Sequence, residues 1–446
     1  MTSKNLRNLF LFAVTLLMVC QLGWAQSAAI PPDKTVVAKA LAAAQATGQA
    51  VPVVPVSAIA AAPRAMARPL VWLGSSLGLP PGPQLTAEPG FCEQQYTGYY
   101  LFCPAGLQTA YGVKQIVGGN GGAGITIAIV DADAYSYAEA NLAVFNTAMG
   151  LPPCTTANGC FTSVNLSSID GSGTGWDLES MLDLEYAHAM APNAKLVYVQ
   201  AATNGYTDMA VAVGIAASMA DIVSNSWSGG ENAAYDHYWN LGKVLLFSSG
   251  DYGNWPSQGY VGYPCSAPTV TCVGGTSLYV NATTHLRSSE IAWGGSGGGC
   301  SGQEGIPWWQ GNNGSGVCSP YRAAPDIAAI ADANTGVAVY ISNPVLGTHY
   351  YRVGGTSLAT PVTAGLVADI DTARVSFGKA KFTFLNPSLY AAATSNYNYF
   401  FYDVASGSNG YPAGLQFDLA TGLGVSAGPA MANRFFGLTV PPPPPQ

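Results

Sequence analysis

The middle of the chain alternates short apolar runs with segments of helical pattern, and this alternation constrains the fold more than any other feature. The apolar runs predict strands at 125–130, 195–200, 221–224 and 243–248, and the other segments predict helices at 176–190, 210–220 and 356–373. Strands that alternate with helices are typical of a mostly parallel central sheet flanked by helices. We therefore predict an α/β fold, with reactive groups where strands end and helices begin.

The composition excludes two broad classes of protein. Hydrophobic residues make up 49% and charged residues 9% of the 446 residues, whereas a disordered chain would be polar and highly charged. The 16 basic and 24 acidic residues give a formal net charge of -8, and the basic residues form no cluster. A nucleic-acid partner is therefore not expected.

Residues 1–26 have the layout of a secretory signal peptide. Lys4 and Arg7 precede an apolar run over 9–20, and small residues follow around Ala25. The alternative is a membrane anchor, but the run is short for a bilayer span. We predict removal of this segment, no stable membrane span in the mature protein, and a secreted product, either extracellular or periplasmic.

The rest of the chain divides into three parts. Residues 27–90 are rich in Ala and Pro and are interpreted as a short pro-segment or linker that is poorly structured. Residues 91–438 are denser in aromatic residues and cysteines and are expected to form the folded domain. Residues 439–446 are a proline-rich tail.

Eight cysteines follow the signal segment and fall into four close sequential pairs, at positions 92, 103, 154, 160, 265, 272, 300 and 318. An even number in an exported protein favours disulfides, and the simplest connectivity joins neighbour to neighbour. Metal binding is the rival interpretation, but no Cys-x-x-Cys with matching histidine spacing is present.

The segment 354–361, Gly-Gly-Thr-Ser-Leu-Ala-Thr-Pro, is the strongest candidate for chemistry. Its two glycines permit a tight turn. Ser357 then falls in the first turn of the predicted helix 356–373, where unpaired N–H groups and the helix dipole favour developing negative charge. A nucleophile fits this position, and so does an ordinary helix-capping hydroxyl.

Acidic residues supply the candidate proton acceptors. Of the four acids in the predicted helix 176–190, Glu179 and Asp183 are spaced i, i+4, which places them on one face with Cβ atoms roughly 5–6 Å apart. Two such carboxylates repel, so one of them should hold a proton tightly. Asp251 belongs to the segment that follows the strand 243–248, at its carboxyl end, and in its protonated form could donate a hydrogen bond to an oxyanion. A solvated acidic face and a simple turn are the alternative interpretations.

These segments together resemble a known family. Gly-Thr-Ser before small residues and Pro361 resembles the nucleophile motif of subtilisin-fold peptidases, yet no His-Gly-Thr-His-type segment is present. The order Glu179 and Asp183, then Asp251, then Ser357 is similar to the sedolisin family of serine-carboxyl peptidases. Further matching segments extend the resemblance over about 91–435, among them Ser224-Asn225-Ser226-Trp227, Val273-Gly274-Gly275-Thr276 and Pro325-Asp326-Ile327.

The resemblance implies a subtilisin-like fold and an endopeptidase acting on protein or peptide substrates, most simply as a monomer. It implies Ser357 as nucleophile, Glu179 as general base, Asp183 as the partner of that base, and Asp251 as oxyanion stabiliser. Trp227 would lie near the carboxylates, and Asp131 would extend their hydrogen-bond chain. Since Asp251 must keep its proton while Glu179 loses its own, activity is expected to peak in acid.

The family also binds one structural calcium ion, and the resemblance implies its ligands here as the side chains of Asp403 and Asp418 and the carbonyls of Val404, Gly414 and Gln416. Gln416 stands where glycine is usual. The long folded prodomain of the family has no counterpart of similar length in 27–90.

Two other functions compete. A catalytically silent sedolisin-like binding or surface protein would be expected to have lost a site residue, and none is missing. A carbohydrate-active enzyme would need carboxyl groups on opposite sides of a sugar rather than on one helix face.

Overall fold

A computed structural model of the chain describes residues 68–69, 72–77, 92–118, 120–311 and 314–430. The predicted signal peptide, most of the stretch 27–90 and the proline-rich tail lie outside these residues.

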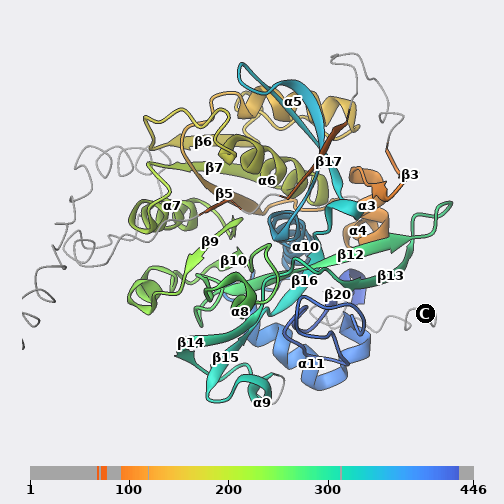
Figure 1. Cartoon of the computed structure of the whole chain (residues 1–446). Helices are drawn as coiled ribbons and strands as arrows, with labels where there is room; N and C mark the ends of the chain where they lie inside the picture. The colour runs from red at the N-terminus through yellow and green to blue at the C-terminus, as the bar shows by residue number, and fades with distance from the viewer. Residues whose placement is uncertain (1–67, 70–71, 78–91, 119, 312–313, 431–446) are drawn as a thin grey trace, which may run out of the picture.

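The central feature is a ten-stranded sheet in the order β19-β20-β16-β12-β10-β8-β5-β7-β6, with β13 paired to β12 (Figure 1). Its inner strands are β6 (Phe161–Asn165), β7 (Lys195–Ala201), β5 (Thr126–Ala132), β8 (Ile222–Asn225), β10 (Val244–Ser248), β12 (Thr271–Val280) and β16 (Ile327–Ile330). Every neighbouring pair among these seven strands is parallel. Antiparallel pairing in this sheet is confined to β13 (Arg287–Ala292) and to β19 (Phe401–Tyr402) with β20 (Val425–Ser426).

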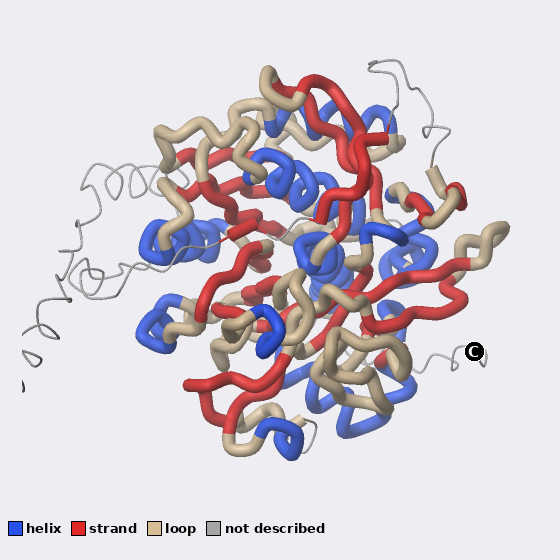
Figure 2. The backbone as a smooth tube through the Cα atoms, in the orientation of Figure 1, coloured by secondary structure: helices blue, strands red, loops and turns tan. Residues whose placement is uncertain are grey.

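Helices cover both faces of the sheet, as Figure 2 shows in blue beside the red strands. On one face α6 (Trp176–Met190) packs against α10 (Thr356–Ser376), and on the other α7 (Tyr206–Met219) packs against β5 and β7. The predicted mostly parallel α/β architecture is thereby confirmed. All predicted strands and helices are present, with ends shifted by four residues or fewer.

Consecutive residues of β5 point into two separate hydrophobic cores. Ile127 and Ile129 belong to the core beneath α6 and α10, whereas Ala128 and Val130 belong to the core beneath α7. Side chains alternate along a strand, so a strand buried on both faces must be apolar at every position. This explains why the sequence shows a continuous apolar run there.

Two small sheets border the central one. One has the order β1 (Arg68–Pro69), β9 (Trp227–Gly230), β11 (Gly262–Tyr263), and the other β17 (Val337–Asn343), β18 (Gly347–Gly354), β2 (Trp72–Leu77). Both β1 and β2 come from the stretch 27–90, where the sequence pattern predicted no strand.

The remaining elements are β3 (Gln94–Tyr96), β4 (Tyr99–Leu101), α3 (Pro104–Tyr111), α4 (Val113–Val117), α5 (Ala138–Ala148), η2 (Ala233–Tyr238), α8 (Trp255–Gln258), β14 (Gly299–Gly305), α9 (Ser315–Cys318), β15 (Tyr321–Ala324), η3 (Ala333–Thr335) and α11 (Asn386–Phe400). Four disulfides join neighbouring cysteines, as predicted: 92–103, 154–160, 265–272 and 300–318. Within the described ranges no helix combines the length and apolarity needed to cross a bilayer.

Candidate active site

Ser357 lies in the first turn of α10, directly after a sharp change of chain direction. Gly355 caps this helix at φ 109°, a left-handed conformation that favours glycine. Gly354 is required for a different reason, because a Cβ there would lie 2.3 Å from the carbonyl oxygen of Ala331. The Ser357 side chain is fully buried, and its Oγ donates to the carbonyl of Ser226 at 3.3 Å.

Glu179 and Asp183 point from α6 toward the start of α10. Glu179 is in hydrogen-bond contact with Ser357. Asp183 is linked to the same residue through Ser226, whose Oγ donates to Asp183 Oδ1 at 2.8 Å and lies 3.2 Å from the carbonyl oxygen of Ser357. The i, i+4 spacing therefore brings Glu179 to Ser357 and Asp183 to Ser226, which connects Asp183 to Ser357.

The other two acids of α6 face elsewhere. Asp177 accepts a hydrogen bond from Asn343 Nδ2 at 2.8 Å, and Glu185 accepts one from the backbone N–H of Tyr340 at 3.0 Å. Both partners belong to β17, so these acids attach α6 to that strand.

Asp251 reaches the site from the loop after β10. Its Oδ1 accepts from the backbone N–H of Thr356 at 2.7 Å and from Thr356 Oγ1 at 2.8 Å. Its Oδ2 is shielded from solvent and has no hydrogen-bond partner among the described residues. Asp251 is thus fixed to the residue before Ser357, with one oxygen left for another group.

Burial makes these carboxyl groups hold their protons. It raises the pKa of Glu179 well above its usual range, and repulsion by Asp183, Asp131 and Asp251 raises it further, while the hydrogen bond with Ser357 lowers it. Burial and repulsion by Asp131 likewise raise the pKa of Asp183. Burial raises the pKa of Asp251 to about 7, against the lowering effect of the two hydrogen bonds from Thr356.

Asp131 lies beside this group, and Trp227 does not. Asp131 is buried in β5, and burial raises its pKa to about 7. Trp227 Nε1 donates to the carbonyl of Val130 at 3.0 Å, and the indole packs against Tyr206 and Phe247 in the core beneath α7. Asp131 thus lies near the carboxyl pair, whereas the Trp227 indole packs on the opposite face of the sheet, contrary to its expected place beside the carboxylates.

Sequence reasoning gave no separate role to Ser226 and Thr356, which connect the site. Ser226 joins Asp183 to Ser357, and Thr356 joins Asp251 to the start of α10. A positional signal existed for Ser226, since it directly follows the parallel strand β8, at the sheet edge where Asp251 was predicted.

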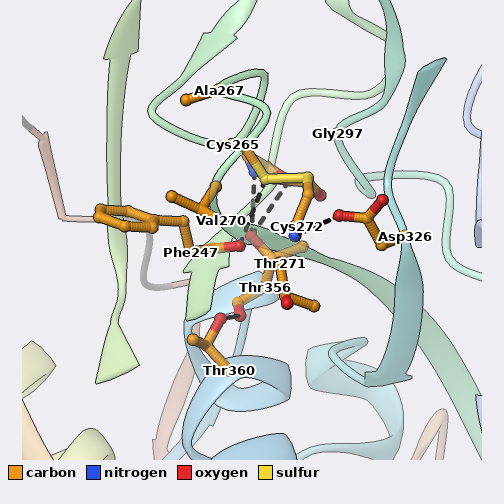
Figure 3. Close-up of a disulfide and its surroundings, with 12 residues drawn as sticks. Phe247, Cys265, Ala267, Val270, Thr271, Cys272, Gly297, Asp326, Thr356 and Thr360 are labelled. Carbon is orange, nitrogen blue, oxygen red and sulfur yellow. Dashed lines mark hydrogen bonds between the residues drawn. A yellow bond between two sulfur atoms is a disulfide. The ribbon is translucent and has the colours of Figure 1, made fainter. Parts of the chain in front are cut away.

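The Cys265–Cys272 disulfide lies beside Phe247 of β10, the strand that leads into the loop with Asp251 (Figure 3). Cys265 Sγ contacts the carbonyl of Phe247 in β10 at 3.3 Å, and Asp326 Oδ2 accepts from the backbone N–H of Cys272 at 2.8 Å. Figure 3 shows Thr356 beside this cluster. The disulfide therefore ties the start of β12 to the end of β10, close to the first turn of α10.

The predicted calcium ligands lie in the chain between β19 and β20, where Asp403 and Asp418 each accept a backbone hydrogen bond. Gln416 N–H donates to Asp403 Oδ1 and Gly414 N–H donates to Asp418 Oδ2, both at 3.0 Å. Gln416 has φ 63°, so it keeps the left-handed backbone that a glycine would favour. Carboxylate and carbonyl oxygens are the ligand types that calcium prefers, and the calcium site stays a prediction.

The fold and this arrangement define a subtilisin-like α/β protein in which carboxyl groups surround the serine. A sequence model of the Subtilase family matches residues 170–383. Kumamolisin from Bacillus sp. (strain MN-32) is 31% identical over 73% of this chain and 62% of its own, and sedolisin from Pseudomonas sp. (strain 101) is 30% identical over 63% and 54%. The chain thus spans about half to three fifths of these relatives.

A solved structure of Pseudomonas sedolisin, described as a serine-carboxyl proteinase complexed with two molecules of pseudo-iodotyrostatin, superposes with a TM-score of 0.65 at 26% identity. The superposition covers 76% of this chain and 99% of that one. The chain belongs to the sedolisin family.

Proposed function

We propose that the chain is a serine-carboxyl endopeptidase that hydrolyses protein or peptide substrates through an acyl-enzyme. The observation that carries the proposal is the contact between a buried serine at a helix N-terminus and a buried glutamate backed by a second carboxyl group. Membership of a family whose named relatives are peptidases supports it.

In the proposed acylation step, Ser357 Oγ attacks the substrate carbonyl and its proton passes to Glu179. Asp183 stabilises the proton gained by Glu179, and Ser226 holds Asp183 in place. The C–N bond then breaks, and the proton leaves with the amine. Water next attacks the ester, with Glu179 again accepting a proton, and Ser357 Oγ recovers a proton as the acid departs.

Asp251 is proposed to stabilise the oxyanion as a neutral acid. Because Oδ1 accepts two hydrogen bonds from Thr356, the proton lies on Oδ2, which is left to donate to the substrate oxygen. Activity then requires one ionised member of the Glu179–Asp183 pair and a protonated Asp251. The rate should therefore follow a bell in acid, with its alkaline limb near the Asp251 pKa of about 7.

Digestion of a mixed peptide pool across pH tests the function, with wild type, Ser357→Ala and Glu179→Gln compared. We expect a maximum in acid, and loss of hydrolysis by at least about a thousandfold in both variants while both remain folded. A maximum at about pH 7–8, or substantial turnover by Ser357→Ala, would reject the assignment. A silent binding protein would give no hydrolysis and no labelling by a serine-directed phosphonate.

One calcium ion is proposed at Asp403, Asp418 and the carbonyls of Val404, Gly414 and Gln416, where it would stabilise the loop without taking part in the reaction. Burial raises the pKa of Asp418, which a cation would oppose. Chelation should lower the thermal midpoint, and added Ca²⁺ should restore it more than Mg²⁺ does. An unchanged midpoint would argue against the site.

Export and maturation are also proposed. The two strands from 27–90 flank the nucleophile: Pro69 pairs with Trp227, next to Ser226, and Trp72 pairs with Gly354, three residues before Ser357. This supports a pro-segment that lies where a substrate would lie. In acid, the exported wild type should lose N-terminal residues while Ser357→Ala stays intact, which N-terminal sequencing of secreted material would reveal.

A further inference from the structure

The segment after β8 forms one wall of the proposed active site. Ser226, whose carbonyl accepts from Ser357 Oγ, leads directly into β9, and η2 follows β9. One edge of β9 pairs with β11 and the other with β1. Under the proposed function, the edge taken by β1 is the one on which an extended substrate would pair. The position of the β9–η2 segment therefore bears on substrate binding.

Strand β14 holds this wall through a set of hydrogen bonds. Glu231, between β9 and η2, accepts from Ser301 Oγ and from the Gly302 N–H at 2.8 Å. Gln303 Nε2 donates to the Glu231 carbonyl at 3.2 Å, and Gln303 Oε1 accepts from the Ala233 N–H at 3.1 Å. The β9–η2 segment is thus attached to β14 through hydrogen bonds at Glu231 and Ala233.

A further contact joins the next residue of β14 to η2, and it is between two acids. Glu304 and Asp236 are in side-chain hydrogen-bond contact. Two carboxyl groups can form a hydrogen bond only if one of them carries a proton. One oxygen of Glu304, Oε1, is shielded from solvent and has no hydrogen-bond partner among the described residues, which disfavours charge on that group.

Two sets of contacts favour Glu304 over Asp236 as the proton donor. Its hydroxyl accepts from Trp239 Nε1 at 2.6 Å and donates its single proton to Asp236 Oδ1 at 2.8 Å. A tyrosine that donates in this way favours an ionised Asp236. Burial raises the pKa of Asp236, but the hydrogen bonds with Tyr263 and Glu304 lower it, whereas the hydrogen bond with Asp236 raises the pKa of Glu304. The proton in the acid–acid contact is therefore assigned to Glu304. Because Tyr263 is part of β11, Asp236 connects β11, η2 and β14.

The surrounding charges favour the same arrangement. Burial, the hydrogen bond with Asp236 and repulsion by Asp236 and Glu231 raise the pKa of Glu304 to about 7, and Arg322 opposes this only partly. The Arg322 guanidinium is fully buried, pairs with Asp326 at 2.6 Å and donates to the carbonyls of residues 265, 267 and 270, while its Nε has no hydrogen-bond partner among the described residues. Among the described residues, Arg322 forms its ion pair with Asp326 and not with Glu304 or Asp236.

We propose that Glu304 is a positioning residue: as a neutral acid it donates a hydrogen bond to Asp236, and this bond holds the β9–η2 segment against β14 in the arrangement that binds substrate. When Glu304 ionises, two carboxylates face each other beside Glu231, and their repulsion separates the β9–η2 segment from β14. The structural part stands alone; the effect on substrate binding rests on the proposed function.

Hydrogen exchange tests the structural part without catalysis. The proteins are Ser357→Ala alone and Ser357→Ala combined with Glu304→Gln or Glu304→Ala, compared at about pH 5 and about pH 8.5 on either side of the titration. After correction for intrinsic exchange, amides of β14 and η2 in the parent protein, which carries Ser357→Ala alone, should exchange about tenfold faster at the higher pH. Gln, which donates to Asp236 at every pH, should remove this difference, and Ala should exchange fast at both. Glu139→Gln, an acid on α5 that bonds to Thr156, should behave as the parent.

No pH difference in the parent would overturn the proposal, even if a variant failed to fold. A Glu304→Gln protein that kept the parent's pH dependence would also overturn it. Steady-state kinetics test the functional part: KM of Glu304→Ala in acid should rise about tenfold with kcat little changed, and Glu304→Gln should restore KM. Absence of any hydrolysis would count against the proposed peptidase and leave the exchange result standing. A fall in kcat alone would overturn the positioning role.

Discussion

At the scale of single residues, burial decides the chemistry of this site. Burial is the largest cause of the raised pKa of Glu179, Asp183 and Asp251 alike. The charged groups that act most strongly on Glu179 are themselves carboxyl groups, so proton sharing takes the place of a cationic partner. Proton-holding carboxyls of this kind lead us to expect an enzyme that works in acid.

Asp251 provides a direct test of the neutral-acid role. Asp251→Ala should lower kcat by about 10²–10³-fold with KM little changed, because it removes one oxyanion donor. Asp251→Asn keeps an amide donor and should recover part of kcat. Its activity should also persist above about pH 7, where the wild-type acid has lost its proton.

Kinetics across pH on peptide substrates, with thermal midpoints as a check on folding, would measure this. The role is wrong if both variants stay folded and are equally inactive at every pH.

At the scale of elements, the sequence predicted those that are buried and regular. The runs that became β5, β7 and β10 are apolar at most positions, and such runs have few alternatives to a strand covered on both faces. Strand β9, with the sequence Trp-Ser-Gly-Gly, has no such pattern, because its pairing depends on β1 and β11 rather than on its own residues.

The active-site residues also fall into two groups, those that a local sequence pattern predicts and those that only contacts in the folded chain reveal. Helical periodicity alone selected Glu179 and Asp183 from the four acids of α6. The roles of Ser226 and Thr356 depend on which strand ends meet in space, and a single serine or threonine in the sequence carries no sign of that.

The loop that carries Asp251 depends on one glycine. A Cβ on Gly297 would lie 1.9 Å from the carbonyl oxygen of Ser249, and Gly297 N–H donates to the Gly250 carbonyl at 2.7 Å. Gly297→Ala must therefore displace backbone next to Asp251. We expect a loss of about 1–3 kcal/mol in the free energy of unfolding, together with lower kcat.

Gly294→Ala is the matched control, because the nearest atom to its Cβ would be the Ser408 carbonyl oxygen at 3.7 Å. It should stay within about 0.5 kcal/mol of wild type. Denaturant unfolding of both variants decides between them, and equal stability would show that this loop adapts.

At the scale of the whole molecule, several acidic residues are buried in the folded protein, although the chain has few charged residues. Besides the site, Asp369 and Asp371 of α10 are buried, and burial raises the pKa of each, that of Asp371 to about 7. Among the described residues, the carboxyl with a lowered pKa is the exposed Asp170. The proton balance of folding is therefore dominated by groups that bind protons more tightly in the folded state.

This balance predicts that the fold is most stable in acid. A carboxyl group with a raised folded-state pKa favours folding below its unfolded pKa of about 4, and loses that contribution as pH rises toward the folded value. Asp131 and Asp251, both raised from 3.8 to about 7, define the window. A shift of this size is worth up to about 4 kcal/mol for each fully buried group, so the free energy of unfolding should fall by several kcal/mol between about pH 4 and about pH 7 and then level off.

Denaturant unfolding of the Ser357→Ala protein, which avoids self-digestion, measures this free energy at each pH. Asp251→Asn, made in the same background, should flatten part of the dependence, because it removes one of the titrating groups while keeping an acceptor for Thr356. A stability maximum near neutral pH, or a dependence that Asp251→Asn leaves unaltered, would mean that the buried acids are ionised in the folded protein. That result would also undermine the neutral Asp251 on which the proposed reaction depends.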